Sequence, residues 1–126
     1  CLALGLVACA TVPKRAAIDD SAAREYMRLL LEERARQRNQ SPFRPDCQIA
    51  EALERIHRDQ SGFEYAGFNA AVVYEECGRA DLGEQLYVEL AAESFAPAQM
   101  NLAANRFAAG RLQEALDLYE AVAAGE

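Results

Sequence analysis

The sequence predicts an all-α fold of about six antiparallel helices stacked as a short solenoid. Its 126 residues are rich in alanine and contain only 4 prolines, a composition typical of helices. No segment alternates between polar and apolar residues in the way an exposed strand does. The C-terminal half repeats with a period of about 32 residues, and stacked pairs of helices have periods of this size.

The first nine residues, CLALGLVAC, form an apolar run unlike anything after it. A membrane-spanning helix needs about 20 apolar residues, so this run is too short to be one. Its length and its small residues fit the end of an export signal. Leu6-Val7-Ala8-Cys9 resembles the bacterial lipobox, and the resemblance implies that Cys9 carries a lipid and becomes the mature N-terminus.

Two other interpretations of this run remain open: Cys1 carries the lipid, or the run is a buried part of the fold. Under the lipobox interpretation, residues 10–20 form a tether, because they are polar and contain Pro13. The sorting rule of lipobox proteins associates a residue other than Asp after the cysteine, here Ala10, with the outer membrane. The resemblance thus implies a lipid anchor on the periplasmic face of a bacterial outer membrane.

Residues 21–63 are expected to form a divergent pair of helices. Tyr26 and Leu30 share a face of the first, over 21–38, which ends in a basic turn. A loop over 39–45 follows, with Phe43 as an apolar plug. A second helix is predicted to follow an N-cap at Asp46. Its apolar stripe comprises Ile49, Leu53 and Ile56.

Residues 64–126 are expected to form four more helices. Ser61–Glu64 and Asp81–Glu84 have the spacing of capping boxes, which predicts the starts of the third and fourth helices. Pro97 suits the first turn of the fifth. Gly78 and Gly110 are predicted to end the third and fifth helices. The sixth is expected over 112–124.

An internal repeat links these four helices. When the segment Asn69–Ala91 is aligned with Asn101–Ala123, the same residue occurs at seven positions. The identical residues are Asn69, Ala71, Gly78, Arg79, Leu86, Tyr87 and Ala91, which match Asn101, Ala103, Gly110, Arg111, Leu118, Tyr119 and Ala123.

The second copy, from Asn101 to Tyr119, resembles the tetratricopeptide repeat (TPR). By this resemblance Gly110 forms the turn between helices, Ala115 is small where two helices cross, and Tyr119 fills the groove to a following repeat. Gly78, Gly83 and Tyr87 take these places in the first copy.

Two features depart from the TPR pattern. Gly67 and Gln99 stand where the family has a large aromatic residue, and the period is shorter than usual. A Sel1-like repeat therefore remains an alternative. Residues 51–54 (EALE) are similar to residues 114–117 (EALD), which suggests that residues 21–58 form a third, degraded pair of helices.

The TPR resemblance implies a concave groove lined by the first helix of each repeat. Two asparagines in this largely apolar set are expected to bond the backbone of a partner peptide. Alternatively, the first two helices fill the groove from within. The implied lining is Tyr65, Phe68, Asn69, Val72 and Glu75 from one copy, with Met100, Asn101, Ala104, Phe107 and Ala108 from the other.

Two cysteines, Cys47 and Cys77, lie outside the leader. In an oxidising compartment we expect them to form a disulfide between the start of the second helix and the end of the third. The alternative is two separate buried thiols. With one histidine, His57, these cysteines do not make a metal site.

The sequence contains no motif of a catalytic or cofactor site. His57 is interpreted as a surface side chain, and the net charge of −7 argues against nucleic acid as a partner. We expect a non-enzymatic protein without cofactors. Leu112, Leu116 and Val122 are expected to leave an apolar edge on the sixth helix. Either a protein partner or a second copy covers this edge, or the helix is polar enough to remain uncovered.

These features predict a periplasmic adaptor or assembly factor for an envelope machine. Small TPR lipoproteins of this kind resemble pilotins and the accessory factors of pilus and secretion systems. The alternative is a permanent structural subunit of a complex associated with the outer membrane.

Overall fold

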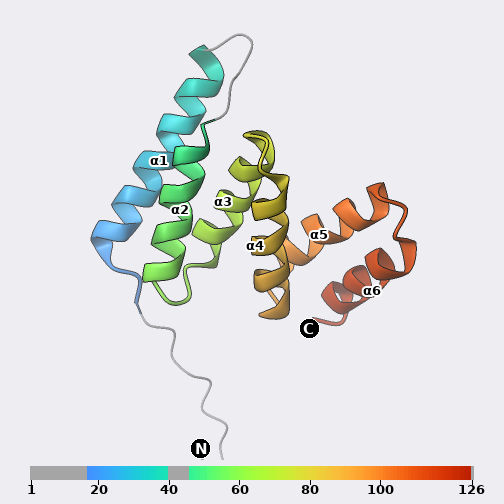
Figure 1. Cartoon of the computed structure of the whole chain (residues 1–126). Helices are drawn as coiled ribbons and strands as arrows, with labels where there is room; N and C mark the ends of the chain where they lie inside the picture. The colour runs from blue at the N-terminus through green and yellow to red at the C-terminus, as the bar shows by residue number, and fades with distance from the viewer. Residues whose placement is uncertain (1–16, 40–45, 126) are drawn as a thin grey trace, which may run out of the picture.

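The computed structural model describes residues 17–39 and 46–125, which form six helices and no strand (Figure 1). This confirms the predicted all-α fold. The predicted lipobox with Cys9, most of the tether and the plug Phe43 lie outside the described residues. The helices are α1 (Asp20–Asn39), α2 (Cys47–Asp59), α3 (Glu64–Glu76), α4 (Ala80–Ala92), α5 (Ala96–Ala108) and α6 (Leu112–Ala123).

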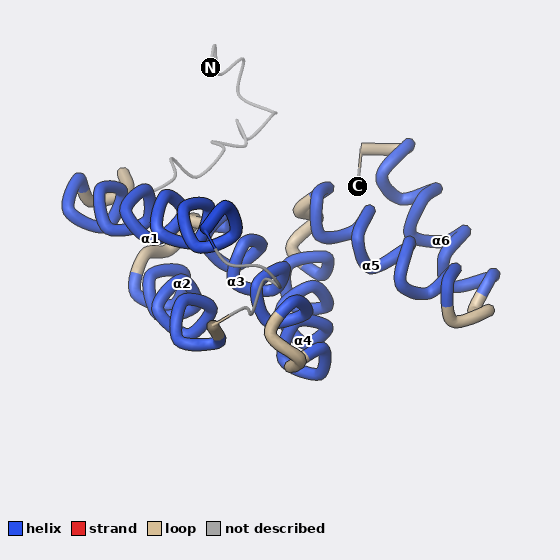
Figure 2. Tube along the Cα trace, turned by 90° about the horizontal axis from the view of Figure 1, so that it is seen from above, coloured by secondary structure: helices blue, strands red, loops and turns tan. Residues whose placement is uncertain are grey.

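Each helix packs mainly against its neighbours in the sequence. Figures 1 and 2 show the result: the helices follow one another across the molecule, with α1 and α6 at opposite ends. This serial packing is compatible with a helical solenoid, in which each unit contacts only the next. The largest fully buried side chains are Leu53, Leu86, Tyr87 and Leu90, from α2 and α4.

The period of the sequence is also the period of the structure. α3 begins at Glu64 and α5 at Ala96, and the starts of α4 and α6 are separated by the same interval, which is that of the sequence repeat. α3 and α5 also end in the same way, because Gly78 (φ 88°) and Gly110 (φ 78°) adopt the left-handed conformation. The next residue then donates its N–H to a carbonyl of the last turn, at 2.8 Å in both cases, which closes a Schellman motif.

Helix crossings are marked by a small residue at the same place in α2, α4 and α6. Ala50, Gly83 and Ala115 are each the fourth residue of their helix, and all three are buried. A Cβ on Gly83 would lie 2.8 Å from the carbonyl oxygen of Ala71, so the two backbones meet closely there. In this register Ala115 is equivalent to Ala50. It is not equivalent to Ala52, contrary to what the similarity between residues 51–54 (EALE) and 114–117 (EALD) suggests.

The two predicted capping boxes are wrong. α3 begins at Glu64 itself, so this residue is at the start of the helix and not in its third position. α4 begins at Ala80, one residue before Asp81, whose carboxylate accepts from the Arg79 guanidinium at 3.1 and 3.2 Å. Neither helix has a side-chain cap. By contrast, Asp46 caps α2 as predicted, accepting from the Gln48 N–H at 2.8 Å.

A disulfide joins the two ends predicted to meet. The sulfur atoms of Cys47, at the start of α2, and Cys77, just after α3, lie 1.99 Å apart, with 5.4 Å between the Cα atoms. The predicted pairing is confirmed. Arg36 of α1 binds the adjacent Asp46 at 2.6 Å, so α1 is held to the same end of α2.

Candidate protein-binding surfaces

Two aromatic residues of the predicted groove, Tyr65 and Phe68, lie where α3 meets the turn before α5. The rings of Tyr65 and Phe68 lie 5.1 and 6.2 Å from the ring of Phe95, both near edge-to-face, and Phe68 is 5.9 Å from Tyr87. Phe68 is half-buried, whereas Tyr65 remains exposed. These rings pack the two repeats together, and Tyr65 also presents a surface to solvent.

Asn69, the next predicted groove residue, is bound within the molecule. Its side-chain amide donates to the Tyr26 hydroxyl at 2.7 Å and to the Tyr65 carbonyl at 2.9 Å. Tyr26 belongs to α1, and its ring lies 4.7 Å from Phe63 at the start of α3. α1 therefore occupies this end of the expected groove, as the alternative interpretation of the sequence anticipated, and both amide hydrogens of Asn69 have partners.

A second polar cluster joins α3, α4 and α5. The Tyr87 hydroxyl donates to Glu75 Oε1 at 2.6 Å and accepts from the Asn101 amide at 3.2 Å. Asn105 donates to Glu75 Oε2 at 3.2 Å. Burial of the Tyr87 ring, and then its bond to Glu75, raise the pKa of this hydroxyl well above its usual value. Asn101 thus stabilises the repeat interface.

The remaining predicted groove residues on α5 are exposed. Met100, Ala104 and Ala108 face solvent, and Phe107 is 64% exposed. Phe107 does not lie with the aromatic residues of α3. It lies instead over α6, so the ten predicted groove residues are divided among several places.

An apolar surface on α5 and α6 gathers four exposed hydrophobic side chains around the buried Ala115. They surround a hollow of about 250 Å³, and the predicted exposure of Leu112 and Leu116 is confirmed, while Val122 is half-buried. We call this surface the C-terminal edge. It comprises Phe107, Leu112, Ala115, Leu116 and Tyr119.

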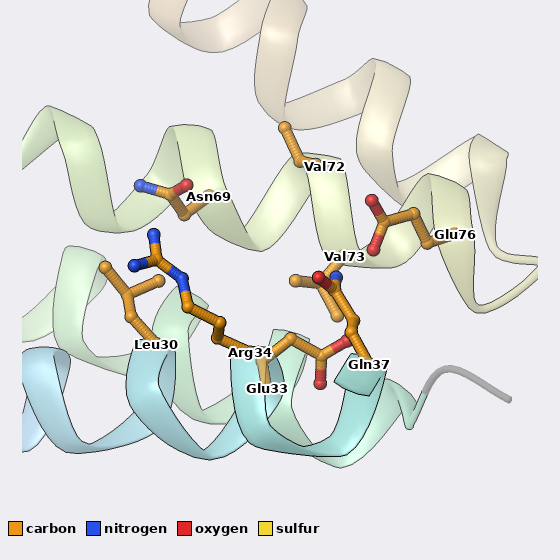
Figure 3. Close-up of a pocket in the computed structure, with 8 residues that line it drawn as sticks. All are labelled: Leu30, Glu33, Arg34, Gln37, Asn69, Val72, Val73 and Glu76. Carbon is orange, nitrogen blue, oxygen red and sulfur yellow. The ribbon is translucent and has the colours of Figure 1, made fainter. Parts of the chain in front are cut away.

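A mixed cavity of about 190 Å³ lies between α1 and α3 (Figure 3). We call it the α1–α3 cavity. The Arg34 guanidinium points toward Asn69 at one end, while the Glu33 carboxylate points the opposite way, toward Gln37. The lining residues are Leu30, Glu33, Arg34, Gln37, Asn69, Val72, Val73 and Glu76.

Glu33 is the unusual residue of this cavity, because it is only 5% exposed and neither carboxylate oxygen has a hydrogen-bond partner among residues 17–39 and 46–125. Burial raises its pKa above the usual range, and Glu76 raises it further, although nearby Arg36 lowers it. The Glu76 pKa is also raised, first by burial and then by Glu75. A buried carboxylate without a partner is costly, which makes Glu33 a candidate binding residue.

Sequence reasoning missed Glu33, although a signal for it exists. Tyr26, Leu30 and Glu33 continue one helical stripe at spacings of four and three residues. A carboxylate therefore occupies a position where the period predicts an apolar side chain.

His57 is half-buried and not a surface side chain as the sequence suggested. Its ring packs on Gly67, where a Cβ would lie 2.8 Å from ring atoms, and its Nδ1 is 3.0 Å from the Phe63 carbonyl oxygen. Thus His57 fills space next to the position where the TPR pattern has an aromatic residue.

Within residues 17–39 and 46–125, no group of three or more His, Cys, Asp or Glu side chains is arranged to hold a metal ion. Over the same residues, no helix has the length and apolar character needed to cross a membrane. No protein-family model, curated protein or solved structure matches the chain.

Proposed function

We propose that this protein is a non-catalytic adaptor or assembly factor that binds another protein of the bacterial envelope, in a machine of the pilus or secretion type. It acts from the periplasmic face of the outer membrane, where a lipid on Cys9 holds it. The C-terminal edge is the observation that carries the binding function. The localisation rests on the lipobox-like sequence alone.

Comparison of equivalent tyrosines supports a role for the C-terminal edge in binding. Tyr87 is 0% exposed because α5 covers it, while Tyr119, its equivalent in the next copy of the repeat, is 37% exposed. Leu112 and Leu116 add apolar surface where the preceding repeat has Ala80 and Glu84. Each Å² of apolar surface removed from water contributes about 25 cal/mol of favourable free energy. A partner that covers this edge therefore forms a more stable complex.

The adaptor and the permanent subunit differ in how firmly the partner is held. A stable, largely apolar interface favours a permanent complex, whereas an adaptor releases its partner. Copurification after mild detergent extraction distinguishes them: a stoichiometric complex that resists salt indicates a subunit, and a partner that dissociates on dilution indicates an adaptor.

The binding function is tested by comparing Leu116→Asn with Leu31→Asn. Leu116 lies in the C-terminal edge and Leu31 on α1, and both side chains are about half exposed. We expect Leu116→Asn to lose the copurified protein and Leu31→Asn to retain it, with unchanged thermal unfolding for both. Equal retention by the two variants would contradict a role for this edge.

The lipid anchor is tested separately with Cys9→Ser. We expect the wild-type chain to incorporate labelled palmitate and to fractionate with the outer membrane, and the variant to do neither. Incorporation that persists in Cys9→Ser and disappears in Cys1→Ser would place the lipid on Cys1.

A further inference from the structure

The geometry points to the α1–α3 cavity as the recess for a single arginine side chain of the partner protein, its guanidinium bound by Glu33 and Glu76. This inference rests on the proposed protein-binding function and names the chemistry that the partner brings. It concerns a surface distinct from the C-terminal edge, at the other end of the row of helices.

The unmet hydrogen-bonding capacity of Glu33 argues for a donor ligand. Both oxygens are buried without a partner in the described part of the chain. The adjacent Arg36 is already bound to Asp46 at 2.6 Å and to Glu32 at 3.4 Å. Arg34 lines the same cavity but points away from Glu33 (Figure 3). A guanidinium donates two parallel N–H bonds to a carboxylate, so one arginine satisfies both oxygens.

A second carboxylate and an apolar wall complete the recess. Glu76 of α3 faces Glu33 of α1 across Gln37, so two carboxylates line this end of the cavity, away from the Arg34 guanidinium. Val72 and Val73 line the side between the carboxylates and Asn69. They suit the methylene stem of an arginine, whose head group then reaches the carboxylates.

The size and the donor set argue against a drug-sized ligand and a metal ion. Pockets for drug-sized ligands have volumes of about 300–1,000 Å³, so a cavity of about 190 Å³ suits one side chain. A bound metal ion is disfavoured because the described residues supply no group of three ligands here. Charge complementarity and volume therefore select a single organic cation.

The test titrates the full chain, with its disulfide intact, with the peptide acetyl-Ala-Arg-Ala-amide. Binding is followed by NMR of the Gln37 and Asn69 side-chain amides. Replacing the arginine of the peptide by citrulline keeps its shape and removes its charge. We expect shifts that saturate with the arginine peptide and none with the citrulline peptide. Equal response to both peptides, or to neither, would overturn the inference.

Matched variants localise the binding. Glu33→Gln is expected to weaken the binding of the arginine peptide by about tenfold, because charge-assisted hydrogen bonds are lost. Glu93→Gln changes the net charge equally at an exposed site beyond α4 and is expected to have no effect. Arg34→Gln is expected to leave binding unchanged or tighter. Weakening by Arg34→Gln but not by Glu33→Gln would overturn the assignment.

Agmatine, a free guanidinium compound, separates a protein partner from a small molecule. We expect it to bind more weakly than the peptide, and tighter binding of agmatine would overturn the partner-arginine assignment. None of these titrations uses the native partner. Failure of the peptide to bind, with copurification still sensitive to Leu116→Asn, would remove this inference and leave the proposed function intact.

Discussion

The Tyr87 hydroxyl donates a 2.6 Å hydrogen bond to Glu75, and this bond joins the two helices of the first repeat. α5 extends the connection, because Asn101 donates to the same hydroxyl and Asn105 to the other oxygen of Glu75. Tyr87 is fully buried, so its hydroxyl and the Glu75 carboxylate satisfy each other where water has limited access. The two repeats are therefore coupled by polar bonds as well as by apolar packing.

Tyr87→Phe is expected to lower the free energy of unfolding by about 1–2 kcal/mol, because Glu75 and Asn101 lose a buried partner. Tyr119→Phe is the matched control at the equivalent position of the second repeat, where the hydroxyl has no partner among the described residues. Urea denaturation measures both. Equal effects of the two substitutions would show that the bond to Glu75 does not stabilise the fold.

Gly67→Ala is expected to destabilise the protein by about 1–3 kcal/mol, although alanine favours helix more than glycine. The new Cβ would lie 2.8 Å from the His57 ring, which its contact with Phe63 holds in place. In the His57→Ala background the same substitution is expected to cost nothing or to stabilise. Thermal unfolding of the four proteins gives the coupling between the two sites, and additive effects would contradict the contact.

The sequence pattern predicted the helices well, because the period, the turn glycines and the Asp46 cap act locally. Gly78 and Gly110 end their helices as expected, yet Ser94 adopts the same left-handed turn (φ 60°) with no glycine to indicate it. The capping boxes failed because their spacing alone does not fix where a helix begins. Ser61, for example, lies three residues before α3.

Tertiary contacts explain why the site was harder to predict than the fold. The hydrogen bond of Asn69 to Tyr26 spans 43 residues, and no local pattern shows that α1 covers this part of α3. Phe107 was assigned to the groove from its repeat position, whereas the structure places it beside Leu112 and Leu116. The burial of Glu33 is likewise a tertiary property, because α1 packs against α2 and lines a cavity with α3.

Loss of the Cys47–Cys77 disulfide is expected to lower the free energy of unfolding by about 3–4 kcal/mol, because the bond closes a loop over a sequence separation of 30 residues. Chemical denaturation with and without reductant measures this loss, and Cys47→Ser with Cys77→Ser should match the reduced protein. Mass spectrometry after alkylation without reductant is expected to show neither cysteine modified. Modification of both thiols in the native protein would contradict the bond.

Glu33→Gln is expected to stabilise the isolated protein by about 1 kcal/mol or more at pH 7, since it removes a buried, unpartnered charge. Because burial raises the Glu33 pKa, the folded state binds more protons than the unfolded state above the ordinary carboxyl pKa. Wild-type stability should therefore fall as pH rises from the unfolded pKa through the folded pKa.

The measurement is urea denaturation of wild type and Glu33→Gln from pH 4 to pH 8. The two curves should converge at the acidic end and separate toward neutral pH. Glu76 also has a raised pKa, so the variant is expected to keep a weaker slope of the same sign. Glu93→Gln should follow the wild-type curve. If Glu33→Gln were less stable than wild type at pH 7, Glu33 would have a stabilising partner, and its carboxylate would not be free to receive the arginine of a binding protein.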